Sequence, residues 1–70
     1  MKAVPTKSIL DIEKKYKELS PILNERGKRI WAATEAASYG KGGVTAVHRA
    51  TGLSRNTIYS GLKEIKRTTI

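Results

Sequence analysis

The most informative stretch of this chain is residues 44–62, which read VTAVHRATGLSRNTIYSGL. Apolar residues recur in and just after it at helical spacing, namely Val44, Val47, Leu53, Ile58, Leu62 and Ile65. Gly52 interrupts the pattern and supplies a residue that accepts a positive φ, while Ser54 is a favoured helix N-cap. We therefore predict helices over residues 44–51 and 55–66 joined by a tight turn, the layout of a helix-turn-helix.

Two further helices are expected before this stretch. Ile9, Ile12, Tyr16 and Leu19 form an apolar stripe that predicts a helix over residues 7–20, which Pro21 ends. Asn24 is a good cap for a second helix over residues 25–38, and the glycine-rich residues 40–43 end it. The expected inward face of this helix is formed by Ile30, Trp31, Ala33, Thr34 and Ala37, with Trp31 as a core anchor. Its alanines, Ala32, Ala33, Ala36 and Ala37, leave a smooth surface that lets a neighbouring helix approach closely.

The predicted fold is all-α, because the chain has no alternating strand pattern. We expect a single domain over residues 1–70, with a helical N-terminal part at 6–38 and the helix-turn-helix at 44–66. This is a homeodomain-like or winged-helix-like bundle of three to four helices without a clear wing. Two positions depart from the usual motif: His48 stands where a small alanine is common, and Gly61 where a branched apolar residue is common. His48 adds side-chain volume and Gly61 removes it, so the two changes are expected to compensate for each other in the packing of the two helices.

The charge balance favours a nucleic-acid partner. The 70 residues carry a formal charge of +8 and a pI near 10.1. Residues 41–70 hold six Lys and Arg against one acid, so most of the surplus accompanies the helix-turn-helix. The chain has no cysteine, one histidine, no signal-like apolar run and no segment near the ~20 apolar residues that span a bilayer. We expect double-stranded DNA as partner, and no enzyme activity, cofactor, metal, membrane or small-molecule ligand.

The second helix of the motif offers the side chains for base reading. Asn56, Ser60, Lys63 and Arg67 fall on the face opposite Ile58 and Leu62, with Arg55 and Tyr59 beside them. Arg pairs with guanine and Asn with adenine, so we predict base contacts by Arg55, Asn56, Tyr59 and Ser60. The predicted contacts to the DNA backbone are made by Lys41, Thr45, Arg49, Ser54, Thr57, Lys63, Lys66 and Arg67. The alternative is that Arg55 and Asn56 are ordinary polar residues of a first helical turn.

Three segments together resemble a known family. They are LNERGKRIWAATEA at 23–36, YGKGGVTAV at 39–47 and ATGLSRNTI at 50–58. They are similar to the N-terminal region of the Rhodopirellula-type transposases, which are DDE insertion-sequence transposases. The resemblance implies binding to the terminal repeats of the element and a place in the bacterial cytoplasm, associated with the nucleoid. The DDE chemistry needs several metal-binding carboxylates, and Asp11 is the chain's single aspartate, so the catalytic activity does not carry over.

Two other functions stay open at this stage. The same fold serves small transcription regulators, which dimerise to match a two-fold operator, and the stripe in residues 8–20 would be the surface for such a homodimer. A basic helical bundle that binds membranes or proteins is the third reading. Salt-dependent binding to duplex DNA, compared with binding to anionic vesicles, distinguishes these classes.

Overall fold

Within the described residues, the fold consists of four helices connected by short turns. The computed structural model describes residues 6–68, and its helices are α1 (Thr6–Leu19), α2 (Glu25–Tyr39), α3 (Gly43–Thr51) and α4 (Arg55–Thr68). No strand occurs within this range, so the predicted all-α class is confirmed. Each predicted helix is present with bounds that differ by at most two residues. The ends of the predicted domain, residues 1–5 and 69–70, lie outside the described range.

The caps expected from the sequence fix the ends of these helices. The Asn24 side chain accepts a hydrogen bond of 2.7 Å from the Gly27 amide and begins α2. Ser54 does the same for α4, because its hydroxyl accepts a 3.1 Å bond from the Thr57 amide. Both bonds satisfy amides that have no partner inside the helix. The two connections are thereby defined by local chemistry.

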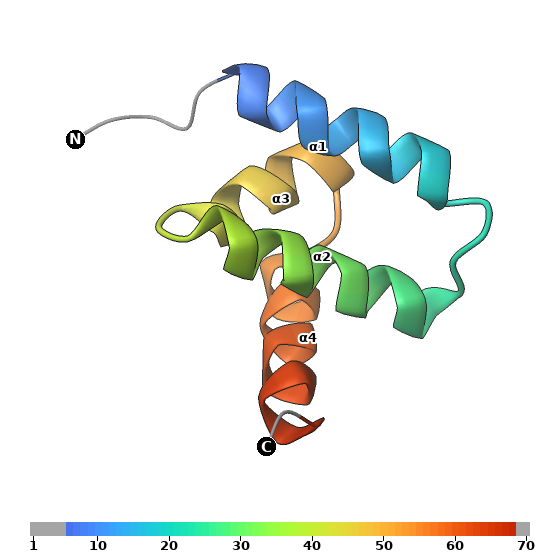
Figure 1. Cartoon of the computed structure of the whole chain (residues 1–70), viewed down its shortest axis with the longest axis vertical. Coiled ribbons are helices and arrows are strands. Elements are labelled where there is room, and N and C mark those ends of the chain that lie inside the picture. The colour runs from blue at the N-terminus through green and yellow to red at the C-terminus, as the bar shows by residue number, and fades with distance from the viewer. Residues whose placement is uncertain (1–5, 69–70) are drawn as a thin grey trace.

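The helices are arranged around α3. Figure 1 shows α1 and α2 running in opposite directions, with α3 between them in this view and α4 crossing α2 steeply. α4 packs mainly on α2, whereas α3 packs on both α1 and α2. The core is small: it consists of Ile12, Ala32, Ala33, Ala36, Ala46, Val47, Ala50 and Ile58. Among the described residues only Val47 and Ile58 are large side chains that are buried completely, as expected for a chain of this length.

The inward face of α2 differs from the prediction. Ala32, Ala33 and Ala36 are buried, while the predicted Thr34 and Ala37 are exposed. Trp31 is only half-buried and stacks on Tyr16 of α1, with ring centroids 5.6 Å apart. The reason is that α2 packs mainly on α4 and α3, and the arc that it turns to them is centred on the small alanines. Trp31 closes the edge of the core instead of filling its middle.

The stripe on α1 is used within the protein. Ile12 is buried, Ile9 packs against the core, and Tyr16 stacks on Trp31. These side chains were the basis for expecting a homodimer through residues 8–20. With the stripe occupied, the large apolar side chain that α1 leaves exposed is Leu10. The dimer stays a prediction, without the free apolar surface that suggested it.

Gly61 marks the closest approach of α4 to α2. A Cβ atom added there would lie 2.5 Å from the Arg29 carbonyl oxygen and 2.8 Å from the Ala33 Cβ. The smooth alanine surface of α2 therefore receives a helix at a position where that helix has no side chain. The volume missing at Gly61 is taken by α2 and not by His48, whose ring bonds elsewhere. The two departures from the usual motif thus have separate explanations.

Candidate nucleic-acid interface

The turn between α3 and α4 is held by side chains of α3. Gly52 has φ 78°, the left-handed conformation that the sequence predicted, and its amide bonds to the His48 carbonyl at 2.9 Å. The Thr51 hydroxyl donates to the Val47 carbonyl at 2.7 Å and accepts from the Leu53 amide at 3.1 Å. The His48 Nδ1 lies 2.7 Å from the Leu53 carbonyl oxygen, so Nδ1–H donates to it. The amide and the carbonyl of Leu53 are thereby both hydrogen-bonded, which fixes the direction in which α4 leaves the turn.

Sequence reasoning did not assign this role to Thr51 or His48. For His48 it noted the added volume at a position where alanine is common, and the structure places the half-buried ring on the turn. The sequence signal was present in part, since a threonine directly before a C-capping glycine is well placed to bond the adjacent backbone. The histidine bond spans five residues across the turn, and only the folded turn brings its partner near.

All four predicted base-reading residues are exposed. Arg55 and Asn56 lie in the first turn of α4, and Tyr59 and Ser60 lie one turn later. The Tyr59 side chain is notable because 51% of this large residue is exposed. On the other side of the helix Ile58 is completely buried, so α4 has one face in the core and these polar side chains outside it. The structure brings the four residues onto one accessible surface.

The predicted backbone-contacting residues fall into two groups. Six are exposed: Lys41, Arg49, Ser54, Lys63, Lys66 and Arg67. Thr45 and Thr57 are half-buried, and the Thr57 hydroxyl is 2.9 Å from the Ser54 hydroxyl. Among the ion pairs within residues 6–68, none involves a cation of α3 or α4. Within the described residues, the positive charges of this surface therefore form no ion pair with the protein's own acids.

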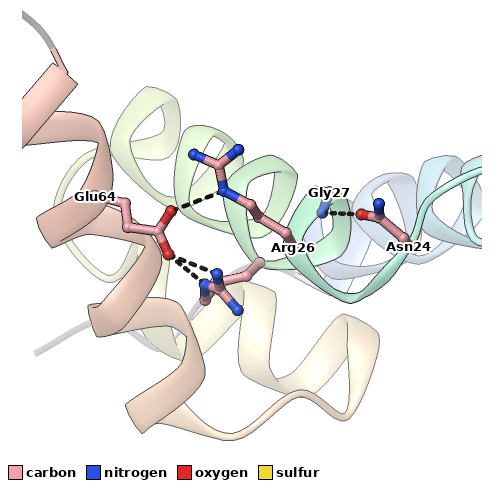
Figure 2. A network of polar contacts seen from close by, with 5 residues as sticks. Asn24, Arg26, Gly27 and Glu64 are labelled. Atoms are coloured by element: carbon pink, nitrogen blue, oxygen red, sulfur yellow. Dashed lines mark hydrogen bonds and ion pairs between the residues drawn. The ribbon is translucent and has the colours of Figure 1, made fainter.

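The acid on α4 is bound to α2. The Oε1 atom of Glu64 accepts a hydrogen bond from Arg29 Nε at 2.7 Å and lies 2.6 Å from Arg29 Nη2 (Figure 2). The Oε2 atom accepts from Arg26 Nε at 3.2 Å. The hydrogen bond from Arg29 lowers the pKa of the Glu64 carboxyl from its ordinary value of 4.5, desolvation opposes this, and Arg26 lowers it further. The carboxylate thus stays charged and its charge is offset on the α2 side. Sequence reasoning missed this cluster because its members are 35 and 38 residues apart.

Between residues 6 and 68 no group of three or more His, Asp or Glu side chains could bind a metal ion. The helices of the same range include none with the length and apolar character needed to cross a bilayer.

The chain matches no protein-family model, no curated protein and no solved structure. The resemblance to the transposase N-terminal region accordingly stays a prediction from the quoted segments.

Proposed function

We propose that this chain binds double-stranded DNA, with α3, the turn and α4 acting as a helix-turn-helix and α4 as the recognition helix. The observation that carries the proposal is the composition of the exposed face of α4. It combines Arg55 and Asn56, which suit base edges, with Lys63, Lys66 and Arg67, which suit phosphates. The acid of this helix is bound by two arginines of α2. A surface of this kind attracts a polyanion, and its hydrogen-bonding side chains are held in fixed positions along a helix.

The proposal includes a biological setting, which rests on the sequence resemblance. We propose that the domain recognises the terminal repeats of an insertion sequence, as a non-catalytic part of a transposase or a remnant of one, at the bacterial nucleoid. A continuation of the reading frame with spaced Asp and Glu residues in a strand-rich pattern would support this setting. DNA binding itself does not depend on it.

The test is a fluorescence titration of the protein against a duplex chosen by in vitro selection and against a scrambled duplex. If about four phosphates are neutralised, log K should fall against log salt with a slope near −3.6. Lys63→Gln should weaken binding and make the slope shallower by about 1. Lys17→Gln, which removes an exposed charge from α1, is the matched control and should bind as the wild type does. Salt-independent binding, or a preference for anionic vesicles over duplex, would refute the proposal.

A further inference from the structure

Two arginines of α2 bind the same carboxylate in different ways. Arg29 uses both Nε and Nη2 on Glu64 Oε1, and its side chain is only 28% exposed. Arg26 uses Nε alone on Oε2, and 69% of its side chain is exposed. In Figure 2 the dashed line from Arg26 to Glu64 starts at Nε, and none starts at either terminal nitrogen of this guanidinium group. Arg29 therefore links α2 to α4. Arg26 binds Glu64 through Nε alone, so its two terminal guanidinium nitrogens remain available to a ligand.

The location of this arginine follows from the helical register of α4. Glu64 lies four residues after Ser60 and three before Arg67, and side chains at those spacings are neighbours on a helix. Ser60 and Arg67 are both exposed. Because Arg26 binds Glu64 from the α2 side, it stands along the edge of the exposed face of α4. The proposed DNA contacts did not include it, since nothing in the sequence places residue 26 beside residue 64.

We propose that Arg26 is a phosphate-binding residue of the DNA interface, oriented by Glu64. The inference rests on the proposed function. An α-helix with its side chains is about 10–12 Å across and the major groove is about 12 Å wide, so an element flanking the helix meets the phosphates at the groove wall. A guanidinium group presents a planar fork that matches phosphate oxygens, and here its plane is fixed in advance by the Nε bond. The cluster of two arginines and one carboxylate also retains a net positive charge.

The experiment measures duplex affinity against salt for wild type, Arg26→Gln and Arg26→Lys, together with the melting temperature of each. Arg26→Gln should weaken binding to selected and scrambled duplexes by the same factor and make the salt slope shallower by about 1. The ratio of the wild-type affinity to the Arg26→Gln affinity should then fall about threefold between 50 and 200 mM salt. The melting temperature should change little, because Arg29 still binds Glu64. Arg26→Lys should not restore the slope, since a single ammonium cannot bind Glu64 and present a fork.

A Glu64→Gln background separates a phosphate contact from simple exposure of the Glu64 charge. The amide oxygen still accepts from Arg26, so adding Arg26→Gln should again reduce the slope by about 1. No difference in that background, a wild-type slope in Arg26→Gln, or full rescue by Arg26→Lys would each overturn the inference. If the wild type binds duplex and Lys63→Gln weakens it, those results leave the proposed function standing. A wild type that does not bind duplex overturns both.

Discussion

Single side chains on α4 differ in what they can recognise because they differ in their position along the helix. Arg55 and Asn56 lie in the first turn, beside the cap formed by Ser54, where a recognition helix brings its end to base edges. Lys63 and Arg67 lie two to three turns later, where the groove wall would present phosphates in the proposed complex. Base reading and phosphate binding both require exposed side chains, and all four of these residues are exposed in the structure.

Replacing Asn56 or Arg55 by alanine should therefore reduce discrimination between sites. We expect a cost of about 1–3 kcal/mol on the selected duplex and a smaller loss on the scrambled one. Lys63→Ala and Arg67→Ala are the comparison, and they should weaken both duplexes equally. Equal weakening of both duplexes by the Asn56 and Arg55 variants would mean that α4 contacts only the DNA backbone. Binding titrations of each variant on both duplexes give the answer.

Contacts between helices depend on two features that are small in the sequence. The crossing of α2 and α4 needs a residue without a side chain at Gly61. The turn from α3 to α4 needs the Thr51 hydroxyl and the His48 ring on Leu53. The first feature sets how closely α4 approaches the bundle, and the second sets its direction. The position of the proposed recognition surface follows from both.

Gly61→Ala tests the crossing. Alanine favours a helix over glycine by about 1 kcal/mol, so propensity alone predicts a more stable protein. The added Cβ would meet a backbone oxygen at 2.5 Å, and neither it nor the Ala33 Cβ can move without shifting α2. Overpacking costs about 1–3 kcal/mol or more, and we expect it to outweigh the gain. Thermal unfolding should show a melting temperature lower by several degrees, whereas Ser60→Ala, on the exposed side, should melt near the wild type.

Thr51→Val tests the turn. Valine keeps the shape but removes both hydrogen bonds, leaving the Leu53 amide without its partner at a cost of about 1–3 kcal/mol. Thr51→Ser keeps the hydroxyl and should retain most of the stability. Urea unfolding of the two variants is the measurement, and identical stability of Thr51→Val and Thr51→Ser would show that the hydrogen bonds of the hydroxyl do not matter.

His48→Asn tests the second bond of the turn. Its side-chain amide can still donate a hydrogen bond from a position near Nδ1, so this variant should bind duplex DNA more tightly than His48→Ala. Duplex titration of the two variants is the measurement.

At the scale of the whole molecule, a thin core leaves a small net stability, so the loss of a single contact between helices is a measurable fraction of it. Val47 and Ile58 are the core's only large, completely buried side chains among the described residues. Residues 6–68 also have one multiple ion pair, at Glu64, and it joins α2 to α4. Because folding lowers the pKa of Glu64, its contribution is present above the unfolded value of 4.5 and is lost as the pH falls toward the folded value.

The pH dependence of unfolding should show this contribution. Wild type and Glu64→Gln should differ most in melting temperature near pH 7, and the difference should narrow below pH 4.5 as the wild-type carboxyl is protonated. The two proteins differ only at residue 64, so the difference isolates the Glu64 carboxyl. A gap that stays constant from pH 7 to pH 3 would show that the ion pair does not act on stability.

Local rules were enough to predict the helices and the exposed residues of the candidate interface. Periodicity placed the four helices, the caps Asn24 and Ser54 placed two of their starts, and Gly52 placed the turn. These features are determined over a few residues by backbone hydrogen bonding and sterics. The same periodicity put Arg55, Asn56, Tyr59 and Ser60 opposite Ile58, and all four are exposed.

Tertiary structure alone decided which elements meet. Trp31 lies at the edge of the core, α4 contacts α2 at Gly61, and Glu64 is bound by Arg26 and Arg29. Each of these depends on a crossing of helices that are far apart in the chain, and side-chain spacing within one helix carries no information about its neighbour. The sequence therefore determined the helices and the polar and apolar faces of α4, whereas the buried face of α2 followed from its packing. Packing of the helices, driven by burial of a small apolar core, determined which charges pair within the protein and which stay exposed.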